Sequence, residues 1–182
     1  MINCAEDPRV ALQLTRYHSW PRLRDQSNGE HSAQIMRILL TVWPDCPRRM
    51  LVHAVTHDMG EMAGDVQYPY KLNNPALKSI MDQLEGSVIE RMGETIGVPP
   101  EVNLSPYEQR VFKLCEFVEM FEYGLHEMGL GNKYGRIIAM RCLTAASEIM
   151  ETMMETNRGE TDVRPAVKRY VDRRQAWESQ NE

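Results

Sequence analysis

The residues with the clearest chemical potential follow an apolar helical run, in the sequence AVTHDMGE at positions 54–61. His57 and Asp58 stand side by side there, and imidazole nitrogen and carboxylate oxygen are ligands that suit Zn, Mn, Fe or Co. Neighbouring side chains of a helix point about 100° apart, but both can reach one ion beyond the helix end. Because an ion needs more than two ligands, further ligands are expected elsewhere in the chain.

Two other segments offer such ligands. His31 lies in the first turn of an expected helix, from which a side chain can project toward a neighbouring helix. Glu116 is acidic within the otherwise apolar stretch 111–118, where a carboxylate is costly to bury unless it is paired or bound to metal. Glu119 and Glu122 are further candidates, although a polar helix face is the simpler interpretation of both.

The elements that must position these residues are helices. Apolar residues recur with a helical period nearly throughout, and no alternating β-branched run is convincing. Pro47 fits the first position of a helix, with Asp45 or Cys46 near the cap position, and Ser105 with Glu108 fits a capping box. We predict one all-α domain over 1–182, a bundle of about six or seven helices with its core at about 12–156. Expected helices cover about 6–15, 30–42, 47–58, 75–96, 105–125, 133–156 and 161–177.

Composition narrows the class of protein. The formal charge of −5 argues against a general nucleic-acid or anionic-membrane binder, which would need a basic surface. No apolar run approaches the roughly 18 residues of a membrane span. The four cysteines contain no CxxC pair, so we expect reduced thiols and a cytoplasmic protein.

The order of these residues resembles a known family. His31, then His57-Asp58, then an acidic residue in a later helix resembles the HD-domain metal phosphohydrolases. The flanking sequence RYHSWP at 16–21, with Gln26 and Glu30 after it, resembles the 5′-deoxynucleotidase branch, which includes phage triphosphohydrolases acting on dATP. Gly64, Asp65, Pro69 and Lys71 extend the resemblance, which covers about residues 12–135.

The resemblance implies a role for each matching residue. His31, His57 and Asp58 match metal ligands, and Glu116 falls where the family's last ligand, normally Asp, is found. Glu61 matches the acidic residue that orients or deprotonates the attacking water. Asp65 matches a residue that shapes the sugar and catalytic region, and Arg16 matches a phosphate-binding arginine.

Substrate contacts can also be argued from residue chemistry. Arg16 can hold phosphate oxygens bidentately, and Lys71 and Lys113 lie close in sequence to the ligands. Trp20 and Tyr17 offer flat surfaces on which a base could stack, although ordinary loop packing of Trp20 is equally consistent. His18 fits a substrate contact or a solvated loop position.

Other conspicuous residues have plainer explanations. His53, four residues before His57, fits a packing role or a contact behind the ligands, since the HExxH glutamate is absent. His126 fits a structural or exposed position. The basic residues of the last helix fit a solvated face or a subunit contact: Arg164, Lys168, Arg169, Arg173 and Arg174.

We therefore expect a metal-dependent deoxynucleoside triphosphohydrolase, with dATP preferred, that releases deoxynucleoside and triphosphate. The cofactor would be Co, Zn, Mn or Fe at the HD site, with Mg on the phosphate chain, and the protein a dimer or hexamer. The nearest alternative is a 5′-deoxynucleotidase that hydrolyses monophosphates. A guanosine tetraphosphate hydrolase would need a base pocket and a diphosphate site that the sequence does not reveal. A catalytically weakened nucleotide-binding HD protein is also open.

Overall fold

The computed structural model describes residues 7–17, 20–63, 73–96, 102–154 and 161–179. These segments contain seven α-helices and one 3₁₀ helix, and the only strand-like pairing among them is an isolated bridge between Thr15 and Ser27. The predicted all-α bundle of six or seven helices is therefore confirmed. The helices are α1 (Pro8–Ala11), α2 (Asn28–Val42), α3 (Arg48–Thr56), η2 (Met59–Ala63), α5 (Pro75–Ile96), α6 (Pro106–Gly129), α7 (Gly135–Met154) and α8 (Arg164–Ser179).

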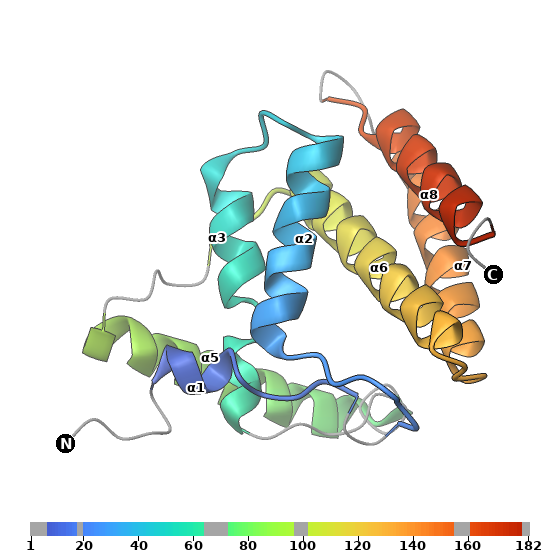
Figure 1. Ribbon diagram of the computed structural model, residues 1–182. Helices are drawn as coiled ribbons and strands as arrows, with labels where there is room; N and C mark the ends of the chain where they lie inside the picture. The colour runs from blue at the N-terminus through green and yellow to red at the C-terminus, as the bar shows by residue number, and fades with distance from the viewer. Residues whose placement is uncertain (1–6, 18–19, 64–72, 97–101, 155–160, 180–182) are drawn as a thin grey trace.

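The main hydrophobic core lies between α2, α3, α6, α7 and α8. Helices α6 and α7 run side by side, and α8 packs against both α2 and α6 (Figure 1). The pair α6 and α7 approaches closely because glycines face each other: a Cβ on Gly135 would lie 2.5 Å from the carbonyl oxygen of Gly124. Met153 is fully buried in this core, as expected for methionine as apolar filler.

A second, smaller core lies under α5. Ala11, Met59, Val88 and Met92 pack α5 against η2 and α1. Gly60 lies directly on the α5 backbone, since a Cβ there would come within 2.7 Å of the carbonyl oxygen of Glu85. The chain therefore passes from the main core to the smaller one immediately after His57 and Asp58.

Several helix boundaries follow the sequence signals. The helix 75–96 and the capping box of Ser105 and Glu108 are confirmed. α2 begins at Asn28, earlier than the predicted residue 30, because the Ser27 side chain accepts a hydrogen bond from the Glu30 backbone N–H at 3.1 Å. Pro47 is the N-cap of α3 rather than its predicted first residue, so Asp45 and Cys46 precede the cap and no side chain caps this helix.

The first expected helix is shorter than predicted. It ends at Ala11 rather than near residue 15, and the chain then turns to run beside the start of α2. The carbonyl oxygens of Leu12 and Leu14 accept hydrogen bonds from the backbone N–H groups of Gly29 and Asn28, at 2.8 and 2.9 Å. This tertiary pairing competes with helical hydrogen bonds and brings Arg16 toward the ends of α2 and α3.

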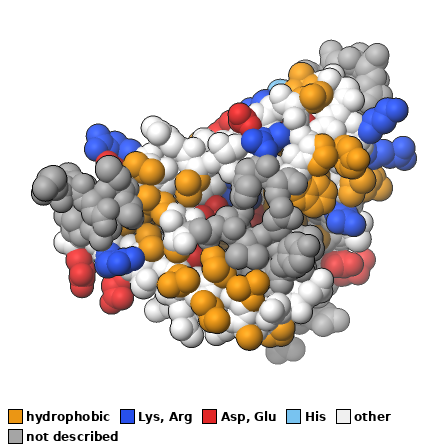
Figure 2. Space-filling view, turned by 90° about the horizontal axis from the view of Figure 1, so that it is seen from below, with side chains coloured by type: hydrophobic (Ala, Val, Ile, Leu, Met, Phe, Trp, Pro, Cys, Tyr) orange, Lys and Arg blue, Asp and Glu red, His pale blue; other side chains and the backbone are white. Residues whose placement is uncertain are grey.

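The surface carries both signs of charge. Seen from below, hydrophobic side chains form separate patches, and Lys, Arg, Asp and Glu side chains lie mainly toward the rim (Figure 2). Among the described residues, no helix is both long and apolar enough for a membrane crossing.

Candidate metal centre

Three of the predicted ligands meet in space. Helices α2 and α3 are antiparallel, so the first turn of α2 and the last turn of α3 lie at the same end (Figure 1). This places His31 beside His57, the C-cap of α3, and beside Asp58. One ligand atom from each of the three residues lies within 4.8 Å of the others. The predicted convergence of two separate helices is thus observed.

The two imidazoles each turn the same nitrogen toward Asp58. His31 Nδ1 lies 2.6 Å from Glu119 Oε2, and His57 Nδ1 lies 3.1 Å from the carbonyl oxygen of Ala54. Each Nδ1 can donate its proton there, which leaves Nε2 as the free lone pair. Both Nε2 atoms are buried and have no hydrogen-bond partner among the described residues. His31 Nε2 lies 3.7 Å from Asp58 Oδ2 and His57 Nε2 lies 3.2 Å from Asp58 Oδ1.

This donor set fits a divalent transition metal. Two imidazole nitrogens and a carboxylate are ligands of Zn, Mn, Fe and Co, and neither buried Nε2 atom makes a hydrogen bond within the described part of the chain. A bound cation would satisfy both of them at once.

The charges around Asp58 keep this carboxyl ionised. Burial would raise the pKa of Asp58, but His57 and then Arg16 outweigh it and hold this pKa well below its usual value. Burial alone would also lower the pKa of His57, yet the adjacent Asp58 raises it overall. Arg16 donates from NH1 to Asp58 Oδ2, and despite burial its pKa is raised, chiefly by Asp58. The predicted phosphate-binding arginine therefore lies at the candidate metal centre.

Glu119 holds the far side of His31. Its Oε2 faces His31 Nδ1, and its Oε1 accepts a hydrogen bond from Gln26 Nε2 at 2.6 Å. Glu119 is only 2% exposed, so its interpretation as part of a polar helix face was wrong. The sequence did contain a signal, because Glu119 follows the apolar residues Phe112 and Cys115 by seven and four positions, the spacing of one helix face.

Glu61 lies next to the centre on η2. Its carboxylate oxygen Oε2 accepts a hydrogen bond from Asn28 Nδ2 at 2.8 Å, and the same amide lies 3.3 Å from the carbonyl oxygen of Asp58. Asn28 is 2% exposed and was not singled out in the sequence. Its position in the first turn of α2, three residues before His31, is the feature that could have identified it.

Glu116 is not part of the three-residue group. It accepts hydrogen bonds from Lys113 Nζ at 2.8 and 3.0 Å. Its negative charge nevertheless acts to raise the pKa values of His53 and His57, so it lies near the centre. Its role as fourth ligand stays a prediction.

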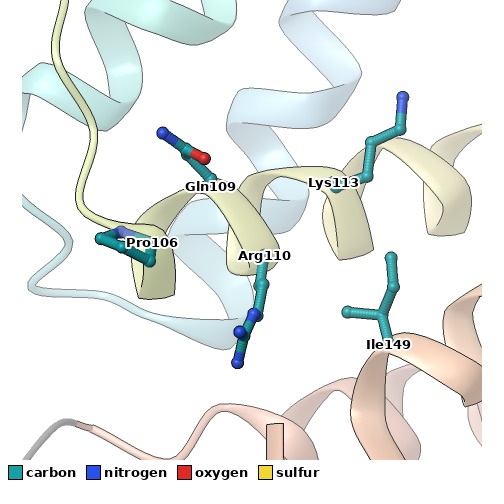
Figure 3. A pocket seen from close by; sticks show the side chains of 5 residues that line it. All are labelled: Pro106, Gln109, Arg110, Lys113 and Ile149. Atoms are coloured by element: carbon teal, nitrogen blue, oxygen red, sulfur yellow. The ribbon is translucent and has the colours of Figure 1, made fainter. Parts of the chain in front are cut away.

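Lys113 also borders an open pocket of about 520 Å³ that is lined by residues of α6 and by one residue of α7 (Figure 3). Arg110 points from α6 toward α7, and Lys113 projects from the next turn of the same helix. The pocket is lined by Pro106, Gln109, Arg110, Lys113 and Ile149. The predicted phosphate contact of Lys113 stays a prediction, and its ammonium group donates to Glu116.

The predicted base-stacking residues lie in the loop before α2. The ring of Tyr17 stacks on Tyr123 with centroids 4.4 Å apart, and Tyr17 has a positive φ of 54°. Trp20 is partly buried, and its backbone N–H donates to the Tyr17 carbonyl oxygen at 2.9 Å. His18, Asp65 and Lys71 lie outside the described residues.

The remaining histidines behave as expected. His53 packs edge-to-face on Phe112 at a centroid distance of 4.4 Å and lies beside His57, which agrees with a packing role behind the ligands. His126 is exposed.

The charged residues on the far side of α6 serve to dock the last helix. Glu122 accepts from Arg37 and from Tyr170, and Arg174 also lies near it. Lys168, Arg169 and Arg173 are exposed, in agreement with a solvated face of α8.

Comparison with known proteins does not assign the chain to a family. No protein-family model matches the chain, and no curated protein matches it either.

Proposed function

We propose that this protein is a divalent-metal phosphohydrolase that acts on deoxynucleotides, with dATP as the first substrate to test. The observation that carries the proposal is the group of His31, His57 and Asp58, with two buried imidazole nitrogens that have no other hydrogen-bond partner among the described residues. The resemblance of the sequence to HD-domain phosphohydrolases supports the substrate class.

A divalent cation bound by these residues would polarise a phosphoryl oxygen and lower the pKa of water. The protein's own side chains supply the remaining functions. Glu61 would accept the proton of the attacking water, and Asn28 holds one oxygen of that carboxylate in place. Arg16 would bind phosphate oxygens, since its guanidinium is at the centre and permanently charged.

One observation favours a second candidate function, a protein that binds metal and nucleotide but hydrolyses the nucleotide slowly. Glu116 is bound by Lys113 and lies outside the three-residue group. A protein with three ligands and a fourth carboxylate held elsewhere would bind metal and nucleotide with little turnover. The monophosphatase alternative uses the same residues, so only the products distinguish it from the triphosphohydrolase.

The test combines metal analysis with product analysis. The wild-type protein, loaded with Co²⁺ or Mn²⁺ and dialysed, should retain about one metal ion per chain, whereas the His57→Ala/Asp58→Ala double variant should retain none. His126→Ala is the matched control, because it removes an exposed histidine.

The same preparations are assayed against dNTPs and dNMPs, with phosphorus NMR of the products. Release of triphosphate from dATP supports the first proposal, and release of phosphate from dAMP alone replaces it with the nucleotidase. Metal binding without turnover of any deoxynucleotide supports the weakened binding protein. A wild-type protein that retains no metal and hydrolyses no nucleotide would overturn the proposal.

A further inference from the structure

The buried carboxylate of Glu119 lies behind His31: its Oε2 faces the Nδ1 atom, whereas the Nε2 atom of the same ring faces Asp58. It connects two polar side chains from different parts of the chain: Gln26 in the loop before α2, and His31 in the first turn of α2. All three residues are at most 2% exposed. Isolating a carboxylate from water costs free energy unless its oxygens are bonded, so this arrangement calls for an explanation.

The geometry explains which nitrogen of His31 is free. Glu119 Oε2 is 2.6 Å from Nδ1, and a carboxylate oxygen there can only accept, so the proton belongs on Nδ1. The lone pair is then on Nε2, which faces Asp58. Without Glu119, the neutral ring could carry its proton on Nε2 instead, where it would block a metal ligand.

Gln26 in turn fixes the carboxylate. Its amide nitrogen donates to Glu119 Oε1 at 2.6 Å, so the two oxygens of Glu119 are divided between two partners and the carboxylate cannot rotate freely. Gln26 also accepts from the backbone N–H of Arg16 through its own carbonyl oxygen, at 2.8 Å. The residue that orients Glu119 is therefore tied to the backbone of the predicted phosphate-binding residue.

We propose that Glu119, held by Gln26, is a positioning residue that fixes His31 in the Nδ1–H tautomer and so presents Nε2 to the metal. This inference rests on the proposed metal site but concerns a property of the free protein. Partners behind a metal-bound histidine typically change metal affinity by 10- to 100-fold when they are removed.

The test compares two substitutions of similar volume. In Glu119→Met the acceptor is lost, whereas in Glu119→Gln an amide oxygen can still accept from Nδ1–H if its amide nitrogen faces a flipped Gln26. That flip is available because Gln26 Oε1 has no hydrogen-bond partner among the described residues. Glu122→Gln, one turn further along α6, is the control for loss of a negative charge from the same helix.

The first readout is the tautomer of His31 in metal-free protein, measured by ¹⁵N–¹H correlation NMR of the imidazole nitrogens. We expect protonated Nδ1 and bare Nε2 in the wild type, Glu119→Gln and Glu122→Gln, and an Nε2–H population in Glu119→Met. The second readout is the affinity for Co²⁺ followed by its visible absorption. It should fall 10- to 100-fold in Glu119→Met and less than about threefold in both Gln variants.

The outcomes separate this inference from the proposed function. If wild-type protein binds no Co²⁺, the metal site fails, while the NMR experiment still tests the tautomer. If wild-type protein binds Co²⁺ and a folded Glu119→Met variant keeps both the Nδ1–H tautomer and the wild-type affinity, the positioning role is overturned. If Glu119→Gln loses as much affinity as Glu119→Met, the charge rather than the acceptor matters, and the inference is also wrong.

Discussion

Asn28 Nδ2 donates a 2.8 Å hydrogen bond to the carboxylate of Glu61 and so links α2 to η2. This contact fixes the orientation of the predicted general base relative to His31, which is on the same helical turn as Asn28. We predict that Glu61→Gln lowers kcat at least about 100-fold, because general base catalysis contributes about that much or more. Asn28→Ala should lower kcat about tenfold with little change in KM.

The measurement is steady-state hydrolysis of the best nucleotide with metal content determined in parallel. Both variants should retain the wild-type metal stoichiometry, since neither residue belongs to the ligand group. Wild-type kcat in Glu61→Gln would exclude Glu61 as the base.

Arg16 provides a second prediction. Its guanidinium contacts Asp58, and a lysine cannot reproduce a planar, bidentate contact with phosphate. Arg16→Lys should therefore weaken productive binding and lower kcat/KM by about 10- to 100-fold, with the larger loss for Arg16→Met. Initial-rate kinetics over a range of nucleotide concentrations measures this effect. Equal loss in the two variants would indicate that the geometry of the cation is unimportant.

The role of Glu116 distinguishes a metal centre with four protein ligands from a weakened centre with three. If Glu116 leaves Lys113 to join a bound ion, Glu116→Ala should reduce metal affinity about tenfold, and Lys113→Met should increase it by removing the competing ammonium group. Competition titration with a metal-chelating dye measures both. Unchanged affinity in both variants would assign Glu116 to a salt bridge alone.

The helices were predictable where signals are local. Pro75 opens α5, and the capping box of Ser105 and Glu108 opens α6, because proline and capping side chains act within one turn. The end of α1 was not predictable from such signals, because Leu12 and Leu14 leave the helix to pair with the distant start of α2.

In the candidate site, too, some residues could be predicted from the sequence and others depend on tertiary packing. His31, His57 and Asp58 were predicted because their types and spacing are distinctive, and the structure brings them together. Glu119 and Glu122 are both acidic residues on α6, three positions apart. Only the packing of α2 and the preceding loop against α6 decides that Glu119 is buried against His31 while Glu122 contacts α8 and Arg37.

His53 gives a pH dependence of stability. Burial, followed by the proximity of His57, lowers its pKa from 6.5 to about 4. The unfolded chain therefore binds the proton more tightly, so stability present above about pH 6.5 is lost as the pH falls toward 4. A shift of this size corresponds to roughly 3 kcal/mol, which solvent screening of a partly exposed ring reduces to about 1 kcal/mol.

Urea unfolding at pH 4.5 and pH 7 measures this loss. The difference between the two pH values should shrink by about 1 kcal/mol in His53→Asn and remain at the wild-type value in His126→Asn, which changes an exposed histidine. An unchanged pH dependence in His53→Asn would show that the ring does not resist protonation in the folded state.

Glu127 provides a prediction for stability alone. It is 1% exposed and accepts from the backbone N–H groups of Leu23 and Arg24, both at 2.8 Å, and from Asn132 Nδ2 at 2.5 Å. A glutamine would turn an N–H group toward at least one of these donors. Glu127→Gln should therefore lower the free energy of unfolding by about 2–3 kcal/mol, and Glu148→Gln, at an exposed position on α7, by less than about 0.5 kcal/mol. Denaturant titration measures both, and equal values for the two variants would contradict the argument.

Gly60, the residue before Glu61, lies against the α5 backbone, so the position of Glu61 depends on the position of α5. His31 and Glu119 lie on α2 and α6, which form the larger core, whereas Glu61 lies on η2, which packs into the smaller core through Met59. Any shift of α5 would carry the base toward or away from the ligands without disturbing the ligands themselves. Occupancy of the centre should therefore hold the two cores together and slow amide hydrogen exchange along α5, which contributes no residue to the ligand group.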